Sequence, residues 1–283
     1  IIRVVKAIRC EMLERQRLEA WAGAYPPVRT PKRVLVVMAG NIPLVGFFDL
    51  LCVLASGHAC RVKPSSKDTV LIGYVVDLLR TIDPAIPLRM AEQGERPDAV
   101  IATGSDNANR YFRMLFGGIP SLLRGSRQSV AVLSGRETAA ELSGLEEDIF
   151  AYSGLGCRNV SLLFLPRGYM PELRCTALNE KYRRNYLRER ALLRMRRMPF
   201  VDLDGAVLCE DRSFPAALSR IHYTFYDSLA DVEAWLAAHD DRLQCVVSQC
   251  VRHSRRVAFG RAQHPGLTDY ADDVDTMRFL GTI

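Results

Sequence analysis

The sequence predicts an α/β protein with two domains, each built on a parallel sheet. Short apolar runs alternate with segments of helical periodicity, and this alternation is typical of parallel strands joined by right-handed helical crossovers. The chain has 283 residues, of which 48% are hydrophobic and 25% charged. This length and composition are sufficient for two domains that each bury a core.

The first predicted domain begins with a helix over 1–22 and continues as strand, turn and helix. Residues 33–40 form an apolar run between chain-breaking residues, which is typical of a strand buried on both faces. The turn 41–43 then leads into an apolar helix over 44–56. Further strands are predicted at 59–63, 98–103 and 129–133, with helices at 69–79 and 108–116.

The character of the sequence changes after residue 133. Further helices are predicted at 137–145, 182–198 and 231–239, and strands at 160–165, 221–225 and 244–248. We therefore expect residues 1–133, with the returning segment 259–283, to form a nucleotide-binding domain. Residues 134–258 would form a second, catalytic domain.

Charge and composition exclude several classes of protein. The net charge is +6, but the excess is concentrated in 181–197 without interleaved aromatic residues of a recognisable motif, so we expect no nucleic-acid partner. No apolar window reaches the ~18 uninterrupted residues of a membrane span, and the first residues lack the apolar core of a signal peptide. The five histidines and eight cysteines form no ligand pairs, so we expect no metal and a cytoplasmic protein with reduced thiols.

The stretch 153–161 contains the strongest candidate for a catalytic residue. Cys157 follows Gly154 and Gly156, and glycines allow a sharp turn that presents a thiol to a pocket rather than to a core. The neighbouring Arg158 would lower the pKa of this thiol, and the thiolate is the nucleophilic form. The alternative is that Cys157 packs as a small hydrophobic residue, as most free cysteines do.

Three turns after predicted strands of the first domain form a candidate ligand site. They contain Asn41, Lys63 and the pair Gly104-Ser105, and ligands of parallel sheets bind at the carboxyl ends of strands. Lys63 suits a ribose hydroxyl or a phosphate, and the helix start at Gly104-Ser105 suits a pyrophosphate. Each position also has a purely structural interpretation, as a turn residue, a surface lysine or a helix cap.

Four short stretches, taken in order, resemble a known family. They are Asn41-Ile42-Pro43, Lys63-Pro64-Ser65, Thr103-Gly104-Ser105 and Gly154-Leu155-Gly156-Cys157. They resemble the N-F-P, K-P-S, T-G-S and G-Q-x-C patterns of the aldehyde dehydrogenase superfamily. The longer stretches 38–47, 102–107, 154–161 and 269–272 are more similar to the LuxC-type acyl-CoA reductases, which make long-chain aldehydes from acyl thioesters.

This resemblance implies an aldehyde dehydrogenase-like fold with a cofactor-binding and a catalytic domain. It implies that Cys157 attacks the acyl carbonyl and carries the acyl group as a thioester. The side-chain amide of Asn41 and the backbone N–H of Cys157 would stabilise the oxyanion. The residues expected to bind the nicotinamide cofactor are Lys63, Ser65, Ser66, Gly104 and Ser105.

Two departures from the superfamily pattern refine the expected reaction. Many members carry a glutamate in an E-L-G-G stretch that activates water, and the matching stretch 132–135 reads Val-Leu-Ser-Gly. Its absence favours an acylating reductase over an aldehyde oxidiser, unless another acid replaces it. The candidates for that role are Glu137, Glu141 and Glu147. Relatives that prefer NAD often carry a glutamate directly after the K-P-S stretch, and this sequence has Ser66 followed by Lys67 there. A carboxylate would repel the 2′-phosphate of NADPH, whereas a serine and a lysine favour it.

The expected activity is that of a long-chain acyl-CoA reductase, which converts acyl-CoA and NADPH into fatty aldehyde, CoA and NADP. One alternative is an aldehyde dehydrogenase that works in the oxidising direction, with or without CoA. Another is a non-catalytic relative that serves as a subunit of an acyl-transfer complex. The resemblance also implies a homo-oligomer, an acyl donor that is CoA or a protein-bound thioester, and an acyl-protein synthetase or acyltransferase as partner.

Overall fold

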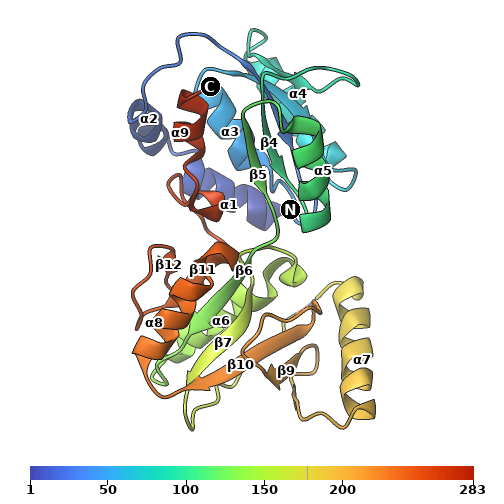
Figure 1. The fold of residues 1–283 in the computed structure, drawn as a ribbon, viewed down its shortest axis with the longest axis vertical. Coiled ribbons are helices and arrows are strands. Elements are labelled where there is room, and N and C mark those ends of the chain that lie inside the picture. The colour runs from blue at the N-terminus through green and yellow to red at the C-terminus, as the bar shows by residue number, and fades with distance from the viewer. Residues whose placement is uncertain (177) are drawn as a thin grey trace. The chain divides into compact units, whose positions relative to one another are not determined.

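The computed structural model describes residues 1–176 and 178–283, and the chain divides into two compact units (Figure 1). The first unit consists of residues 1–126 with 266–283, and the second of residues 127–265. The first junction lies before residue 133 because β6 (Gln128–Val132) pairs with β7 (Val160–Pro166) and β11 (Leu243–Ser248) of the second unit. The chain returns to the first unit at Gly266 rather than at residue 259.

The first unit contains five parallel strands in the order β3-β2-β1-β4-β5. Three of them coincide with predicted strands, namely β1 (Arg33–Val37), β2 (Ala59–Lys63) and β4 (Ala99–Thr103). The edge strands β3 (Leu88–Met90) and β5 (Ser121–Arg124) were not predicted; they have only three and four residues and give a weak sequence signal. The three central strands therefore set the frame of the sheet.

Local contacts explain why two helices of the first unit begin at residues other than those predicted. The helices of this unit are α1 (Ile2–Met12), α2 (Arg15–Gly23), α3 (Phe47–Ala55), α4 (Thr69–Ile82), α5 (Asp106–Phe116) and α9 (Thr276–Gly281), with the short helix η3 at Ala271–Asp273. The predicted helix 1–22 is divided because the Glu14 carboxylate caps α2, accepting from two backbone N–H groups of its first turn at 3.0 and 3.2 Å. The predicted start of α3 at Leu44 is displaced because that residue has a left-handed backbone, with φ of 56°.

A buried ion pair joins β5, α3 and α9. Arg124 is 3% exposed and donates from Nη1 to both carboxylate oxygens of Asp49, at 2.6 and 2.7 Å. Its Nη2 donates to Thr276 Oγ1 at 2.7 Å. Because both charges are buried, removing either one would leave the other without compensation.

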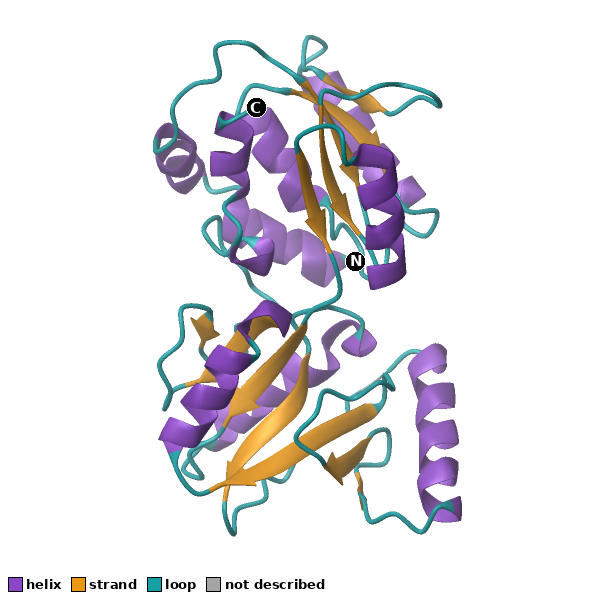
Figure 2. Ribbon diagram, viewed as in Figure 1, coloured by secondary structure: helices purple, strands orange, loops and turns teal. Residues whose placement is uncertain are grey.

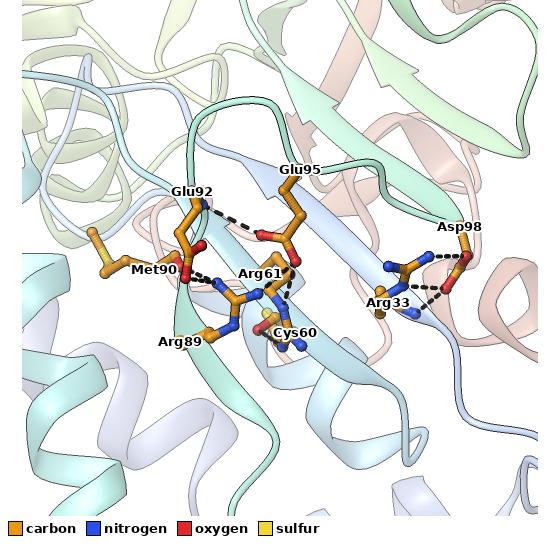
Figure 3. A network of polar contacts seen from close by, with 8 residues as sticks. All are labelled: Arg33, Cys60, Arg61, Arg89, Met90, Glu92, Glu95 and Asp98. Carbon is orange, nitrogen blue, oxygen red and sulfur yellow. Dashed lines mark hydrogen bonds and ion pairs between the residues drawn. The ribbon is translucent and has the colours of Figure 1, made fainter.

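Charged side chains hold the connection between β3 and β4, which contains no helix (Figure 3). Glu95 accepts from Arg61 Nε at 3.0 Å and from Arg89 Nη2 at 2.8 Å. Asp98 accepts from the Arg33 guanidinium at 2.9 and 3.0 Å, and these hydrogen bonds lower the pKa of Asp98 to about 2. The connection is thereby attached to β2, β3 and β1.

The second unit contains a seven-stranded sheet in the order β12-β11-β6-β7-β10-β9-β8. Its recorded pairings are parallel, except that β8 runs antiparallel to β9. The strands not yet introduced are β8 (Val201–Asp202), β9 (Val207–Glu210), β10 (Arg220–Tyr226) and β12 (Arg256–Val257). The helices are α6 (Ala139–Phe150), α7 (Glu180–Met195) and α8 (Leu229–Ala238), with short helices η1 (Ala151–Gly154) and η2 (Asp240–Arg242).

Helices cover both faces of the second sheet, so its central strands are apolar on both sides (Figure 2). Along β6, Ala131 belongs to the core cluster that contains Leu145 of α6, and Val132 to the cluster that contains Leu236 of α8. The neighbouring β7 alternates in the same way. Because both faces of the sheet are covered, polar side chains that could bind a ligand are expected at the strand ends and in the loops that follow them.

Candidate functional site

The carboxyl ends of β2, β1 and β4 are neighbours in the first sheet. Val37 at the end of β1 pairs with Lys63 of β2 and with Ala102 of β4. The turns after these strands therefore lie at one edge of the sheet. The structure gathers there all the residues expected to bind the cofactor, together with Asn41; these are Lys63, Ser65, Ser66, Gly104 and Ser105.

The turns after β1 and β2 contact one another. A Cβ placed on Gly40 would lie 2.4 Å from Ser65 Oγ, closer than a side chain can approach. The backbone C=O of Ser65 accepts from the N–H of Asp68 at 3.0 Å, and the Asp68 carboxylate accepts from the N–H of Leu44 at 2.7 Å. Burial raises the pKa of Asp68, although the Leu44 N–H acts in the opposite direction. The two turns therefore form one linked structure.

Lys63, Ser66 and Asn41 have exposed side chains at this edge. Lys63 is in register with Val37 and Ala102, which belong to the core cluster beneath α5. Residues in register on parallel strands share a face of the sheet, so the Lys63 side chain projects on the α5 side. Its ammonium group can reach an anionic ligand bound at this edge.

The start of α5 is a weaker anion site than the sequence pattern indicates. Ser105 Oγ accepts from the N–H of Ala108 at 3.3 Å and so acts as the helix cap. Asp106 lies in the first turn and accepts from the N–H of Ser126 at 2.9 Å, which places a carboxylate at the positive end of the helix. A Cβ on Gly104 would lie 2.9 Å from Ala108 Cβ, so packing against α5 already requires this glycine.

The thiol of Cys157 is exposed in the second unit, in the loop between η1 and β7. Four other thiols are buried, those of Cys52, Cys60, Cys209 and Cys245. The interpretation of Cys157 as a small core residue is therefore wrong. Cys157 is exposed to solvent on this unit.

The loop that leads to Cys157 has an unusual backbone. Tyr152, Ser153 and Gly154 adopt φ of 53°, 55° and 64°, and a left-handed conformation is unfavourable for the two residues that have a Cβ. Ser153 Oγ accepts from the N–H of Asn179 at 3.0 Å. A conformation of this kind persists only where surrounding contacts hold it.

Asn159 supplies most of those contacts. It is 5% exposed, and its Nδ2 donates to the carbonyl oxygens of Asp148, Ile149 and Ala151 at 3.1, 3.1 and 2.9 Å. Its Oδ1 accepts from the N–H of Gly156 at 2.8 Å. This role was not among the expectations from the sequence, although asparagine side chains commonly hydrogen-bond nearby backbone in turns such as this glycine-rich one.

The backbone of Cys157 is also attached to the sheet. Ser129 Oγ on β6 donates to the C=O of Cys157 at 2.9 Å and accepts from the N–H of Cys245 at 3.2 Å. Burial raises the pKa of the Cys245 thiol to about 11, although the charge of Arg158 acts to lower it. Cys245 is therefore a protonated structural thiol beneath the exposed one.

Asp148 at the end of α6 joins this helix to the segment after β12. It is fully buried, and its carboxylate accepts from the N–H of Gly260 at 2.7 Å and of Ala262 at 3.0 Å. Burial raises the pKa of Asp148 to about 7, although these two N–H groups act in the opposite direction. The helix that ends beside the Cys157 loop therefore depends on an acid that titrates near neutral pH.

Solved structures identify the architecture. An aldehyde dehydrogenase from Mycobacterium tuberculosis in complex with NAD+ matches with a TM-score of 0.57 and 17% identity, over 71% of this chain and 53% of that chain. A putative aldehyde dehydrogenase from Burkholderia cenocepacia matches with a TM-score of 0.60 and 17% identity, over 85% of this chain and 66% of that chain. The fold is aldehyde dehydrogenase-like.

The aldehyde dehydrogenase-like fold, with its two α/β units, is the one expected from the sequence. The chain spans 53% and 66% of the length of the two dehydrogenases compared. No family model matches the sequence, and no curated protein matches it.

Across residues 1–176 and 178–283, no group of three or more His, Cys, Asp or Glu side chains could hold a metal ion. In the same part of the chain, no helix is long and apolar enough to cross a membrane.

Within this aldehyde dehydrogenase-like fold, the stretch 132–135 is far from the candidate nucleophile. Ser129 pairs with Val160, so Cys157 lies beside the amino end of β6. Ser134 follows the carboxyl end of β6, about 17 Å away along a strand that rises about 3.3 Å per residue. The expectation that 132–135 stands in the place of the E-L-G-G stretch is therefore corrected, and its lack of an acid says nothing about the direction of the reaction.

Two of the acids considered as replacements lie at the same distant edge. Glu137 accepts from the N–H and Oγ of Ser134 at 2.5 and 2.7 Å. Glu141 accepts from the N–H and Oγ1 of Thr138 at 2.7 and 2.8 Å, which completes a capping box. Both line a cavity of about 210 Å³ that also contains Gln249. They shape the start of α6 and cannot act on Cys157.

Proposed function

We propose that the chain acts as a long-chain fatty acyl-CoA reductase in which Cys157 carries the acyl group. The observation that supports this best is the exposed thiol of Cys157, held on a loop that Asn159 and Ser129 fix by hydrogen bonds. The longer stretches 38–47, 102–107, 154–161 and 269–272, which resemble acyl-CoA reductases, are the basis of the reductase assignment. The aldehyde dehydrogenase-like fold supports an oxidoreductase that uses a nicotinamide cofactor.

The proposed chemistry begins with acyl transfer to the enzyme. The Cys157 thiolate attacks the acyl carbonyl, a new carbon–sulfur bond forms, and the bond to CoA breaks as its thiolate leaves. The family resemblance implies that the Asn41 amide and the Cys157 N–H would donate to the oxyanion, and loss of one such donor typically lowers the rate ~100-fold. NADPH, when bound, supplies the hydride that converts the thioester into the aldehyde and free thiol.

The proposed cofactor site is the carboxyl edge of the first sheet. The exposed Lys63 ammonium and the Ser66 hydroxyl would hold the ribose and its 2′-phosphate, with Ser65 fixing the turn. Gly104 and Ser105 would bind the pyrophosphate more weakly, because Asp106 already complements the helix start. NADPH is accordingly proposed over NADH, because Ser66 and Lys67 are the exposed side chains of the turn, whereas its acid, Asp68, is buried and accepts from the N–H of Leu44.

Acylation followed by intact mass spectrometry tests the proposal. Protein incubated with palmitoyl-CoA without NADPH should gain one palmitoyl group, and peptide mapping should place it on Cys157. Cys157→Ser should lose both this label and aldehyde formation. Cys10→Ser, a change at another exposed thiol, should retain both. Labelling that persists in Cys157→Ser would disprove the mechanism.

Two alternatives remain as competing outcomes. An oxidising aldehyde dehydrogenase would turn over aldehyde with NADP faster than acyl-CoA with NADPH. A non-catalytic subunit of an acyl-transfer complex would fail to bind NADPH, which titration of cofactor fluorescence would detect. The same proposal includes a homo-oligomer, a cytoplasmic location, and an acyl-protein synthetase or acyltransferase as partner. Sedimentation of the purified chain tests whether it forms a homo-oligomer.

A further inference from the structure

Helix α7 and the residues that follow it carry the positive charge of this protein. Residues 180–197 contain eight basic side chains and two acids, a net charge of +6, and the whole chain also has a net charge of +6. The rest of the chain therefore sums to zero. A charge concentrated on one element creates a local field that attracts an anionic partner.

The inner face of α7 is accounted for by packing. Tyr186 and Leu193 are buried in a cluster with Val207 and Cys209 of β9, and Figure 1 shows α7 along the outer side of this strand. Of the two acids of α7, Glu189 is buried and accepts from Arg220 Nη2 at 2.6 Å, and the exposed Glu180 pairs with Arg184 at 2.5 Å. A single exposed acid does not neutralise the outer face.

The outer face combines apolar and basic side chains. Leu187, Ala191 and Met195 recur every four residues and form an exposed stripe, in which Leu187 is 49% and Met195 80% exposed. Met198 continues the stripe beyond the helix and is 46% exposed. Exposed basic residues border the stripe on both sides; they are Lys181, Arg183, Arg184, Arg188, Arg194, Arg196 and Arg197.

We propose that this face of α7 docks the protein on the anionic surface of a lipid bilayer. Guanidinium groups match phosphate oxygens through paired hydrogen bonds, and clusters of basic residues bind anionic lipid headgroups. The apolar stripe enters the boundary between headgroups and acyl chains, as in helices that lie flat on membranes. At 1.5 Å per residue, α7 is about 24 Å long and spans several headgroups. The proposal does not depend on the chemistry of Cys157.

Other occupants fit these observations less well. A second copy of α7 would bring two faces of the same charge together, which is unfavourable. A nucleic acid would match the arginines but would leave Leu187 and Met195 against a charged backbone. A bilayer matches both the charge and the apolar stripe, so it is the partner that the face favours.

Vesicle co-sedimentation of the full chain tests the proposal. Binding to phosphatidylcholine vesicles that contain about one third phosphatidylglycerol should greatly exceed binding to phosphatidylcholine alone and should weaken with salt. The triple variant Arg183→Gln, Arg188→Gln, Arg194→Gln should lower the partition coefficient ~100-fold. The control variant Arg80→Gln, Arg96→Gln, Arg212→Gln changes the net charge equally at exposed sites elsewhere and should stay within ~2-fold.

A second pair of changes separates insertion from charge. Leu187→Ser with Met195→Ser should weaken binding ~10-fold while leaving the salt dependence unchanged, because it removes apolar contact only. Circular dichroism checks that each variant keeps its helix content. Equal losses in both triple variants, or no preference for phosphatidylglycerol, would overturn the proposal. Release of the protein from the vesicles by free CoA or inorganic phosphate, at the same phosphate concentration as the vesicles, would also overturn it.

Discussion

Replacement of Asn159 by Ala should loosen the Cys157 loop and destabilise the second unit. The buried side chain makes four hydrogen bonds, three to carbonyl oxygens and one from the N–H of Gly156. At a net value of about 1 kcal/mol each, with partial replacement by water, we expect a loss of ~3 kcal/mol in the free energy of unfolding. The left-handed residues Tyr152 and Ser153 would then relax.

Urea unfolding measures this loss, with a tryptophan as the reporter. The chain has two tryptophans, so Trp21→Phe leaves Trp235, which lies in the second unit. A loss of ~3 kcal/mol lowers the urea midpoint by ~1 M at an m-value near 3 kcal/mol/M. Ser143→Ala, at an exposed position of α6, is the matched control and should change stability by less than ~0.5 kcal/mol.

A second readout separates loop position from thiol reactivity. Alkylation of Cys157 by iodoacetamide should change little in Asn159→Ala, because the thiol is already exposed. Acylation by palmitoyl-CoA should fall at least ~10-fold, because the carbonyl must meet a fixed sulfur and oxyanion donors. A midpoint within error of the parent protein, or unchanged acylation, would refute the role assigned to Asn159.

Three further predictions concern the two cores. The pKa of Asp148 rises from 3.8 to about 7 in the folded state, so its contribution to stability is present below pH ~4 and is lost as pH rises through ~7. Asp148→Asn should therefore destabilise more at pH ~5 than at pH ~8, by ~2 kcal/mol, in urea unfolding. Arg124→Met leaves Asp49 buried without its partner and should cost ~3–5 kcal/mol, whereas the double variant with Asp49→Leu should recover most of this. Gly144→Ala places a Cβ 2.8 Å from the Gly260 nitrogen and should lower the melting temperature, although alanine favours a helix.

Different outcomes would contradict each of these. A stability difference between parent and Asp148→Asn that is the same at both pH values would mean that the carboxyl titrates normally. Equal losses in the single and double variants of the Arg124 pair would show that burial of charge is not the cause. An unchanged melting temperature in Gly144→Ala would show that the contact between α6 and the segment at Gly260 yields easily.

Apolar runs were sufficient to predict the centre of both sheets. β1 and β4 contain uninterrupted buried residues, and their sequence signal is strong because both faces are covered. Edge strands such as β3 and β5 gave no signal, because Arg89 and Arg124 find partners that only the folded chain supplies. The domain junction was placed too late because an apolar run does not reveal which sheet a strand joins, and β6 joins the second.

The candidate site was predicted in part for similar reasons. The turns with Lys63 and Gly104 follow strands, and adjacency of those strands brings them together. The position of 132–135 was predicted wrongly because the sequence does not show which end of β6 lies beside the Cys157 loop. The loop lies at the amino end of β6, and residues 132–135 lie at its carboxyl end. The role of Asn159 was not predicted because its side chain donates to backbone carbonyl groups of residues up to eleven positions earlier. Every residue has such a carbonyl group, so the sequence does not mark these partners.

The hydrogen bonds of Asn159 have a consequence for how this protein could change over evolution. One side chain satisfies three carbonyl oxygens and one N–H around the bend, so the path of the backbone before the thiol is set mainly at a single position. A substitution at position 159 would alter the backbone of the whole bend at once. Selection that changes the surroundings of the sulfur is therefore expected to retain Asn159 and to act on other side chains.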